Sequence, residues 1–300
     1  VSSLRVIHLL SIGSTGIPQQ PDMVLQYRSS NGEPYLRLPE PHTNIIITPH
    51  RAEGIDETSA ALTQMLNDPA IALNLQNTPY PYTRSHAEEW IKANCEEQQD
   101  MLAALREELD QQSMNASASE VGNEHTIHKS PTRMFDICPF TCIREVVESE
   151  KGYEGSFKDV LIGEIRLARS SFEDFPKTGP EREHAKKVND DLSVGDPSII
   201  WSFGGTLPLP ESMSAQEPAI INGKGIMTLV IQTILHDWAV PRMNVHRLRC
   251  WAFEDNAGSI RVFEKNGFVR GHTLKDWASV SESRGGGKKS IVSLEWTRYT

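Results

Sequence analysis

Apolar residues recur at intervals of three and four in one segment in the second half of the chain. They fall at Met227, Val230, Ile231, Ile234, Leu235 and Trp238. This spacing predicts an amphipathic helix with one buried face. A glycine-rich stretch, Asn222-Gly223-Lys224-Gly225, precedes it. Glycines let backbone N–H groups approach a bulky anion, and the free N–H groups at a helix start favour a phosphate. A flexible loop before a core helix is the other interpretation.

A strand and a second helix are predicted further along. Residues 247–253 alternate in polarity and contain aromatic side chains, a pattern typical of a strand. Asn256 is suited to cap the next helix, whose apolar face contains Ile260 and Phe263. Gly267 is suited to end that helix. The pattern therefore predicts the order glycine-rich loop, helix, strand, helix.

Elements are also predicted on either side of this region. β-branched and aromatic runs predict strands over 44–48, 142–147, 160–168, 198–207, 268–280 and 290–299. The strands at 142–147 and 160–168 should form an antiparallel meander, and the last two a hairpin across Gly285–Gly287. Helical spacing predicts helices over 49–67 and 85–109, the second with Ser85 and Glu88 as a capping box.

Polar segments without periodicity separate these elements. Residues 1–43 are rich in Ser, Pro, Gly and Gln, and we expect an N-terminal extension that lies on the domain or is partly disordered. Residues 44–300 then form one domain. Its core is expected to carry three insertions, near 111–132, 170–196 and 208–221.

Composition narrows the class of protein. The chain has 300 residues, of which 38% are hydrophobic, enough for one core with polar loops. Its net charge of −10 argues against a nucleic-acid partner and favours cationic partners such as amines. No apolar run reaches membrane-spanning length, so no membrane partner is expected. The oligomeric state stays open.

The cysteine count predicts a reducing compartment. Four cysteines are too few for a disulfide scaffold, so we expect a cytoplasmic or nuclear protein. His125, His128, Cys138 and Cys142 can be written as a zinc set. The segment between them is irregular and lacks the usual tight cysteine spacing, so no metal site is expected.

The motif order resembles the acetyl-CoA-binding half of the GNAT superfamily of N-acetyltransferases. The resemblance rests on G-K-G-I-M-T from Gly223, a helix, a strand, and then N-x-x-S-I-R-V-F-E-K-N-G-F from Asn256. It is closest to the RimJ/RimL branch, which Asp68-Pro69 and the run 81–91 also resemble, and it extends over roughly 44–298. It implies an α/β (α+β) fold: a mixed, mostly antiparallel central sheet flanked by helices, with a splayed strand pair holding acetyl-CoA.

The resemblance also implies which residues bind the cofactor acetyl-CoA. The first of the splayed strands would be 198–207, whose Gly204 and Gly205 suit a bulge or a close backbone approach. The implied cofactor-binding residues are Leu207, Asn222, Gly223, Lys224, Gly225, Ile226, Met227, Thr228, Asn256, Ser259 and Phe263.

Two positions depart from the family pattern. Phe263 stands where many GNAT enzymes carry a tyrosine general acid, so Ser259 or water takes that role, or the thiolate leaves unprotonated. Ile220 replaces a usual Gln or Arg, which weakens the predicted grip on phosphate.

The general base is predicted to be Glu164, acting directly or through water. Glu254, Asp255 and solvent are the alternatives. Tyr80, Tyr82 and Trp201 are candidates for the wall of the acceptor pocket or for the core.

The predicted activity is acetyl transfer from acetyl-CoA to a primary amine by direct attack in a ternary complex. A protein or peptide N-terminus is the predicted acceptor. A small-molecule amine acetyltransferase and a non-catalytic CoA-binding domain are the two alternatives.

Overall fold

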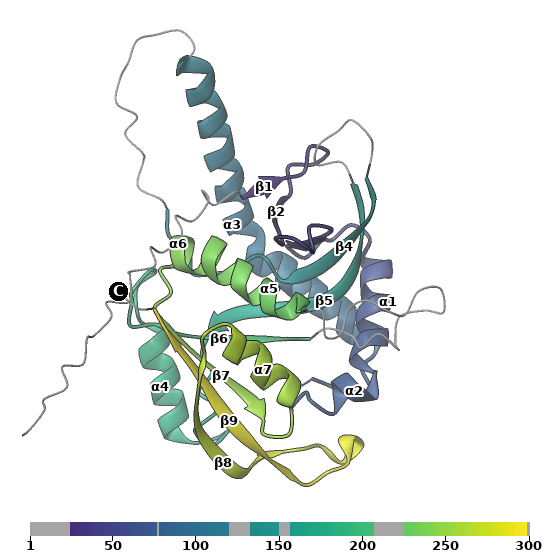
Figure 1. Cartoon of the computed structure of the whole chain (residues 1–300), viewed down its shortest axis with the longest axis vertical. Helices are drawn as coiled ribbons and strands as arrows, with labels where there is room; N and C mark the ends of the chain where they lie inside the picture. Colours follow the sequence, from purple (N-terminus) through teal and green to yellow (C-terminus); the bar gives the residue numbers. More distant parts are fainter. Residues whose placement is uncertain (1–24, 77, 120–132, 150–156, 207–224, 299–300) are drawn as a thin grey trace, which may run out of the picture.

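The computed structural model describes residues 25–76, 78–119, 133–149, 157–206 and 225–298. Nine strands form one sheet in the order β1-β2-β3-β4-β5-β6-β7-β9-β8 (Figure 1). They are β1 (Gln26–Tyr27), β2 (Pro34–Arg37), β3 (Ile45–Thr48), β4 (Cys142–Ser149), β5 (Phe157–Arg169), β6 (Ile200–Thr206), β7 (Arg247–Phe253), β8 (Val269–Ser279) and β9 (Lys288–Thr297). Every neighbouring pair is antiparallel except β6 and β7. The predicted mixed, mostly antiparallel sheet is confirmed.

Helices connect and cover the strands. They are α1 (Ile55–Leu66), α2 (Pro69–Ala72), α3 (Arg84–Ser119), α4 (Pro180–Asp190), α5 (Ile226–Ile234), α6 (Val240–Met243) and α7 (Ala257–Lys265). In Figure 1, α5 and α7 lie in front of the sheet, and α1 and α2 lie near the ends of β4 and β5. None of the helices in the described part of the chain combines the length and apolar character that crossing a membrane needs.

The hydrophobic core has two main parts. In the larger part, the apolar face of α5 packs on the middle strands. This face includes Val230, Ile231 and Ile234. The predicted helix runs on through a π-helical turn, Leu235–Ala239, into α6. The smaller part lies between α1, the start of α3 and strands β4 and β5. The α1–α3 layer is therefore packed on the part of the sheet next to the β6/β7 pair.

Local sequence signals explain most helix boundaries. Asn256 caps α7 through a bond from the Ser259 N–H to Asn256 Oδ1 (3.0 Å), and Gly267 follows the helix with a φ of 80°. Both predicted caps are confirmed. The capping box predicted for α3 is wrong by two residues. The Thr83 N–H donates to His86 Nδ1 (3.1 Å) and the His86 N–H donates to Thr83 Oγ1 (3.3 Å).

Three segments predicted as irregular contain regular structure. The helix α3 continues to Ser119, so the first part of the predicted loop at 111–132 is helical. Helix α4 lies within the predicted insertion at 170–196, and strands β1 and β2 lie within the predicted extension. The segments 111–132 and 170–196 are too polar to show a hydrophobic period, whereas β2 is too short to show one although its Leu36 is buried in the core.

Candidate active site

The two central strands β6 and β7 separate after one short stretch of pairing. They are paired only at Ile200–Arg247 and Trp201–Leu248. Beyond these pairs β6 remains bonded to β5 as far as Thr206, and β7 remains bonded to β9 as far as Phe253. Both strands therefore continue past the point where they part, and the sheet opens between them. This is the splayed strand pair that the resemblance implied.

The edge of β6 facing this opening keeps unused backbone groups. The N–H of Phe203 donates to Cys250 Sγ (3.2 Å), so a thiol takes the place of a backbone partner there. Backbone groups alternate in direction along a strand, so the N–H and carbonyl of Gly205 face the same side as those of Phe203. The opening thus presents backbone donors near the end of β6.

The two glycines of β6 differ in their surroundings. A Cβ at Gly205 would lie 2.7 Å from the Glu164 carbonyl oxygen and 3.0 Å from Ile165 Cα, whereas a Cβ at Gly204 would have no atom within 4 Å. The predicted close backbone approach is confirmed at Gly205. The predicted bulge alternative is wrong, because β5 and β6 pair without a register shift.

The first turn of α5 packs in the same core part as Phe203 of β6 and Cys250 of β7, through the side chain of Ile226. Gly225 precedes the helix with a φ of 79°, and no side chain caps the helix start. A Cβ at Gly225 would have no atom of the described residues within 4 Å. The first helical N–H groups, at Ile226, Met227 and Thr228, have no intrahelical partner. This geometry suits a phosphate.

The predicted cofactor-binding residues are only partly described. Leu207, Asn222, Gly223 and Lys224 lie outside the described residues. The side chain of Ile226 is buried in the core, while Met227 and Thr228 are half-buried. The backbone of the α5 turn, rather than the Ile226 side chain, is therefore what faces a ligand.

The second patterned helix, α7, contains the predicted residues Ser259 and Phe263, and the predicted Asn256 directly precedes it. Asn266, at the end of α7, donates to the Thr228 carbonyl (3.2 Å) and so joins α7 to the first turn of α5. Asn256 uses Oδ1 as a cap, and Ser259 is half-buried one turn into the helix. Phe263 is buried against Phe268, with ring centroids 5.0 Å apart. Phe263 is a core residue with no polar atom to offer a leaving thiol.

Glu164 lies one strand away from the opening. It is paired with Thr206 at the end of β6 and with Cys142 on β4. Its Oε1 atom accepts from Trp90 Nε1 (3.2 Å) and lies 3.2 Å from His50 Nε2. Only 14% of its side chain is exposed. The predicted base is thus held in a defined position next to the strand that borders the splay.

Burial and charge change the proton affinities around Glu164. Burial alone would lower the pKa of His50, but Cys142 and Glu164 outweigh it and raise that pKa to about 10. His50 is therefore an imidazolium at neutral pH. Burial, followed by the charges of Glu164 and Glu89, raises the pKa of Tyr82 to about 12. The neutral Tyr82 phenol lies in the smaller core part, and Trp201 lies in the larger one.

The two alternative bases are engaged elsewhere. Glu254 bonds Lys275 Nζ (2.7 Å) and Asp255 bonds Lys289 Nζ (3.0 Å). Both carboxylates border a polar hollow of about 330 Å³ that also contains Asp276, Lys288 and Ser290. Glu164 remains the predicted base, because it lies beside the end of β6, whereas these two carboxylates face the lysines of this hollow.

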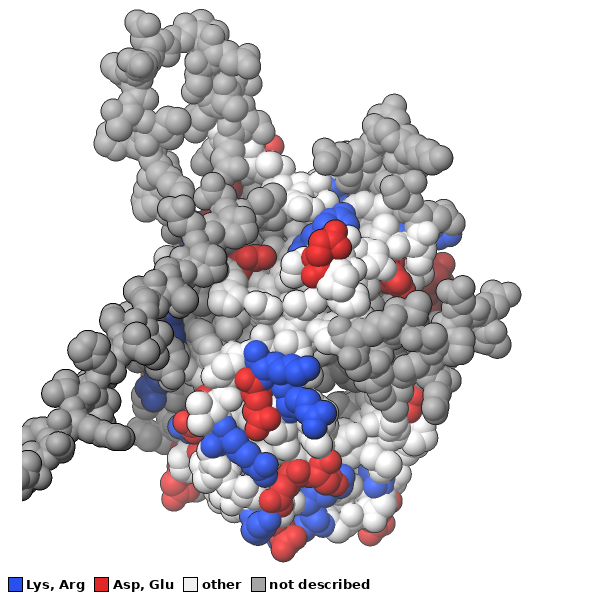
Figure 2. Space-filling view, viewed as in Figure 1, with Lys and Arg blue, Asp and Glu red and all other residues white. Residues whose placement is uncertain are grey.

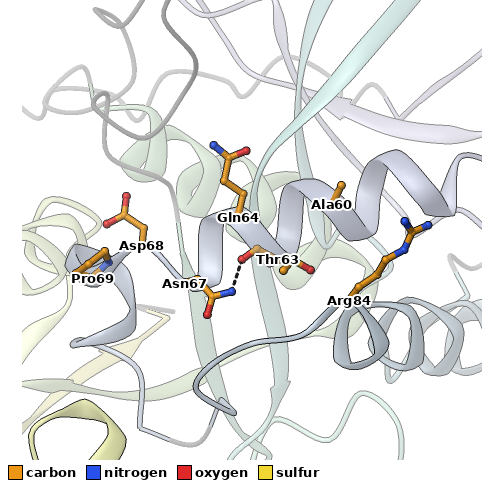
Figure 3. A pocket seen from close by; sticks show the side chains of 7 residues that line it. All are labelled: Ala60, Thr63, Gln64, Asn67, Asp68, Pro69 and Arg84. Carbon is orange, nitrogen blue, oxygen red and sulfur yellow. Dashed lines mark hydrogen bonds between the residues drawn. The ribbon is translucent and has the colours of Figure 1, made fainter.

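A second hollow lies away from this chemistry. It has a volume of about 690 Å³ and lies over α1, α2 and the start of α3 (Figure 3). Its lining residues are Ala60, Thr63, Gln64, Asn67, Asp68, Pro69 and Arg84. None of them is a predicted site residue. Its contact with the site is indirect, because Asn67 donates to the Tyr82 carbonyl (2.7 Å).

The hairpin of β8 and β9 reaches across to the loop before α3. Arg284 donates to the carbonyls of Leu75 (2.7 Å) and Thr78, and its guanidinium lies 5.8 Å from the Tyr80 ring centroid. On the described part of the near face, basic and acidic side chains are interspersed over α7 and this hairpin (Figure 2). That face carries no large basic patch.

Sequence reasoning missed His50, Cys142 and Trp90 as neighbours of Glu164. Each comes from a different part of the fold, and no motif of the sequence links them. The histidine follows β3, the cysteine begins β4, and the tryptophan is in α3. Strand pairing, Thr48 with Cys142 and Cys142 with Glu164, brings the histidine and the cysteine to Glu164, and the packing of α3 on β4 and β5 adds the tryptophan.

Comparisons with known proteins find similarity to one family and to several solved structures. Residues 221–268 match the model of the Acetyltransferase (GNAT) family. Among solved structures, an apo form of RimL, the ribosomal L7/L12 α-N-protein acetyltransferase, is 12% identical with a TM-score of 0.48, covering 92% of this chain and all of that one. A GNAT-family acetyltransferase from Bacillus anthracis is 11% identical with a TM-score of 0.46, covering 88% of this chain and 98% of that one.

A third neighbour is the microcin C7 self-immunity acetyltransferase MccE, solved with acetyl-CoA and AMP. It is 10% identical with a TM-score of 0.44, covering 85% of this chain and 93% of that one. No curated protein matches the sequence. The family match spans α5, β7, α7 and the residues that join them, which is the region where the resemblance was strongest. The segment 221–268 is therefore similar to the GNAT acetyltransferase family.

Proposed function

We propose that this protein is an acetyl-CoA-dependent N-acetyltransferase that acetylates a primary amine at a protein or peptide N-terminus. One observation carries the proposal: β6 and β7 part beside the uncapped, glycine-led start of α5. This arrangement lies at the edge of the segment that matches the GNAT family. It offers backbone donors for both a phosphate and a pantetheine arm.

The residues that would hold acetyl-CoA fit its chemistry. The N–H groups of Ile226, Met227 and Thr228 are free for the pyrophosphate, and the open space at Gly225 lets it approach. Asn222, Gly223 and Lys224 are proposed to extend this cradle, with Lys224 as its cation. Acetyl-CoA, when bound, supplies an acetyl group activated as a thioester.

Backbone donors of β6 would polarise the acetyl carbonyl. The N–H of Gly205 faces the opening, and a fixed N–H that meets developing negative charge lowers the barrier to acyl transfer. Gly205 also approaches the backbone of Glu164 closely. The donor and the base are therefore held by one pair of strands.

Glu164 is proposed to accept the proton of the attacking amine. An ammonium is not a nucleophile, so the acceptor must lose a proton before or during attack. The Glu164 carboxylate is mostly buried and held by two donors on Oε1. Ser259, half-buried at the start of α7, is proposed to assist the departing thiolate in place of the absent tyrosine.

Direct transfer is favoured over a covalent enzyme intermediate. Burial raises the pKa of Cys138 and of Cys250 to about 12, so both stay thiols. Cys142 is also fully buried, and burial raises the pKa of the half-buried Cys95. A thiolate, rather than a thiol, is the nucleophile in acyl transfer to cysteine. Cys138 and Cys250 are thus poor acyl carriers.

The basicity of the acceptor amine favours an N-terminal acceptor. An α-amine has a pKa of about 8, whereas a lysine-like amine has one of about 10.4. A single carboxylate therefore suits an N-terminal amine, a large share of which is already neutral near pH 8. The acidic residues Glu88 and Glu89 at the start of α3 would attract a cationic peptide.

Two measurements test this function. Calorimetry should give an acetyl-CoA affinity in the low-micromolar range or tighter. A thiol-release assay should show turnover with peptides bearing a free N-terminus and none with the same peptides blocked by acetylation. Turnover on small amines alone would replace the peptide acceptor by a small molecule. Binding without turnover on either panel would leave a CoA-binding domain, and the absence of binding would refute the proposal.

A further inference from the structure

We propose that His50 is a positioning residue for acetyl transfer, which anchors one oxygen of the Glu164 carboxylate and leaves the other for the acceptor amine. This inference rests on the proposed function, in which Glu164 is the base. His50 itself is buried, and the contacts described for it are with Glu164, Cys142 and Gln98. It would act only through Glu164.

The sheet places His50 beside Glu164 through a row of paired strands. Thr48, at the end of β3, pairs with Cys142, and Cys142 pairs with Glu164. His50 follows two residues after Thr48, and its backbone N–H donates to Gln98 Oε1 of α3 (3.3 Å). Gln98 in turn donates to Thr141 Oγ1 (3.3 Å). Both the strand and the helix therefore fix the backbone that carries the imidazole.

Two ring N–H groups converge on the same carboxylate oxygen. His50 Nε2 and Trp90 Nε1 each lie 3.2 Å from Glu164 Oε1. Among the described residues, no hydrogen-bond donor is assigned to Oε2. A carboxylate in which one oxygen accepts two hydrogen bonds cannot rotate freely, so the other oxygen, Oε2, keeps one direction. That fixed direction is what a base needs to meet an amine at a set distance.

The surroundings favour a charged imidazole. His50 faces Glu164 on β5, Cys142 on β4 and, further away, the Glu89 carboxylate and Tyr82 phenol at the start of α3. The only nearby full charges in this group are negative, apart from His50 itself. An imidazolium beside Glu164 stabilises the negative charge of that carboxylate. His50→Ala removes this stabilisation, which is the reason to measure activity against pH.

Trp90 is held from its other side. The guanidinium of Arg166 lies 5.5 Å from the Trp90 ring centroid and pairs with Glu97 (2.9 Å). The indole is partly exposed, so replacing it disturbs little of the core. Trp90→Phe removes the second donor to Oε1 while keeping the ring. It is the matched partner for a His50 variant.

The experiment compares kcat/KM against pH for wild type, His50→Ala, His50→Gln and Trp90→Phe. His184→Gln, at an exposed histidine of α4, is the control. We expect His50→Ala to lower kcat about a hundredfold, as for a small misplacement of a reacting group, with the acetyl-CoA affinity unchanged. Its acidic limb should move to higher pH. His50→Gln keeps an N–H donor, so part of kcat should recover. It carries no charge, so the acidic limb of its pH profile should stay shifted as in His50→Ala.

Several outcomes would overturn the inference. One is a His50→Ala enzyme whose kcat and pH profile match those of wild type. Another is loss of wild-type activity on EDTA treatment, which would make the His50, Cys142 and Glu164 donors, all within 4.8 Å of one another, metal ligands. If His50→Ala does not fold, an unchanged profile in both His50→Gln and Trp90→Phe overturns it instead. A wild-type protein without turnover refutes the proposed function first, and this inference with it.

Discussion

The half of the site that would hold the donor and the half that would receive the amine are built in different ways. The donor half comes from one continuous run, β6 to α7, in which each element follows the last along the chain. The acceptor half draws Glu164 from β5, His50 from the end of β3 and Trp90 from α3. Local order forms the first half, and strand pairing forms the second.

The two halves therefore rest on different evidence for function. The donor half carries the family match and uses backbone groups, which many sequences can supply. The acceptor half uses specific side chains whose neighbours are far away in sequence. A substitution in one half should therefore change binding or chemistry, but not both, and Gly205 at their junction is the exception.

The largest expected effect is on chemistry alone. Glu164→Gln keeps the shape and the acceptor oxygen for Trp90 and His50, but removes the charge that takes the proton. We expect kcat to fall by about 10² to 10⁴ at neutral pH, the usual contribution of a general base. Acetyl-CoA affinity, measured by calorimetry, should stay within about twofold of wild type. A kcat close to wild type would assign the base to solvent.

A substitution at Gly205, where the two halves meet, should change both acetyl-CoA binding and catalysis. At Gly205→Ala the new Cβ meets the Glu164 carbonyl and Ile165 Cα, which are backbone atoms that cannot move aside without shifting β5. We expect a loss of about 1–3 kcal/mol in the free energy of unfolding, together with lower kcat and weaker binding. Gly204→Ala, whose Cβ meets nothing within 4 Å, is the control for stability. Equal melting temperatures for the two variants would contradict the close approach.

The donor half can be perturbed alone at Gly225. Its φ of 79° is a left-handed conformation, which costs an alanine about 1–2 kcal/mol. Gly225→Ala should therefore weaken acetyl-CoA binding about tenfold while kcat at saturation stays near wild type. Gly225→Asn tolerates the conformation better and should bind more tightly than the alanine variant. Equal affinities for all three proteins would exclude this turn from the site.

A smaller effect separates two roles of Asn256. Asn256→Ala removes the cap on Ser259 N and should cost about 0.5–2 kcal/mol in the free energy of unfolding. Asn256→Asp keeps the cap, so its melting temperature should match wild type. If the amide also contacts the donor, Asn256→Asp should still bind acetyl-CoA more weakly. Full affinity in the aspartate variant would limit Asn256 to capping.

The smallest expected effect is a slope of stability against pH. The pKa of His50 is raised from 6.5 to about 10 in the folded protein. Its contribution is therefore fully present below about pH 6.5 and is lost as the pH rises through 10. Between pH 7 and 10 the wild-type melting temperature should fall more steeply than that of His50→Gln. Parallel curves would indicate a neutral His50.

The sequence predicts the donor half of the site better than the acceptor half. The helix at Ile226, the strand at Arg247 and the caps Asn256 and Gly267 were all predicted from spacing, because local order determines them. The resemblance to the GNAT superfamily arose from this run, and the family match confirms it.

The acceptor half was predicted only as one residue, Glu164. His50, Cys142 and Trp90 have no period or motif that links them, since their contacts depend on the register of three strands and one helix. The α3 cap was misplaced for a related reason. Histidine at position 86 takes the role that the motif reserves for Glu or Gln, so the pattern pointed to Ser85 instead.

Hydrogen exchange with and without acetyl-CoA tests the central claim most directly, because it reports on the backbone N–H groups themselves. The account predicts that acetyl-CoA slows exchange in peptides covering residues 202–206 and 225–229. Peptides from β1 and β2, far from the opening in the sheet order, should not change. Protection elsewhere, with exchange at β6 and the start of α5 unaltered, would contradict a donor site between the parted strands.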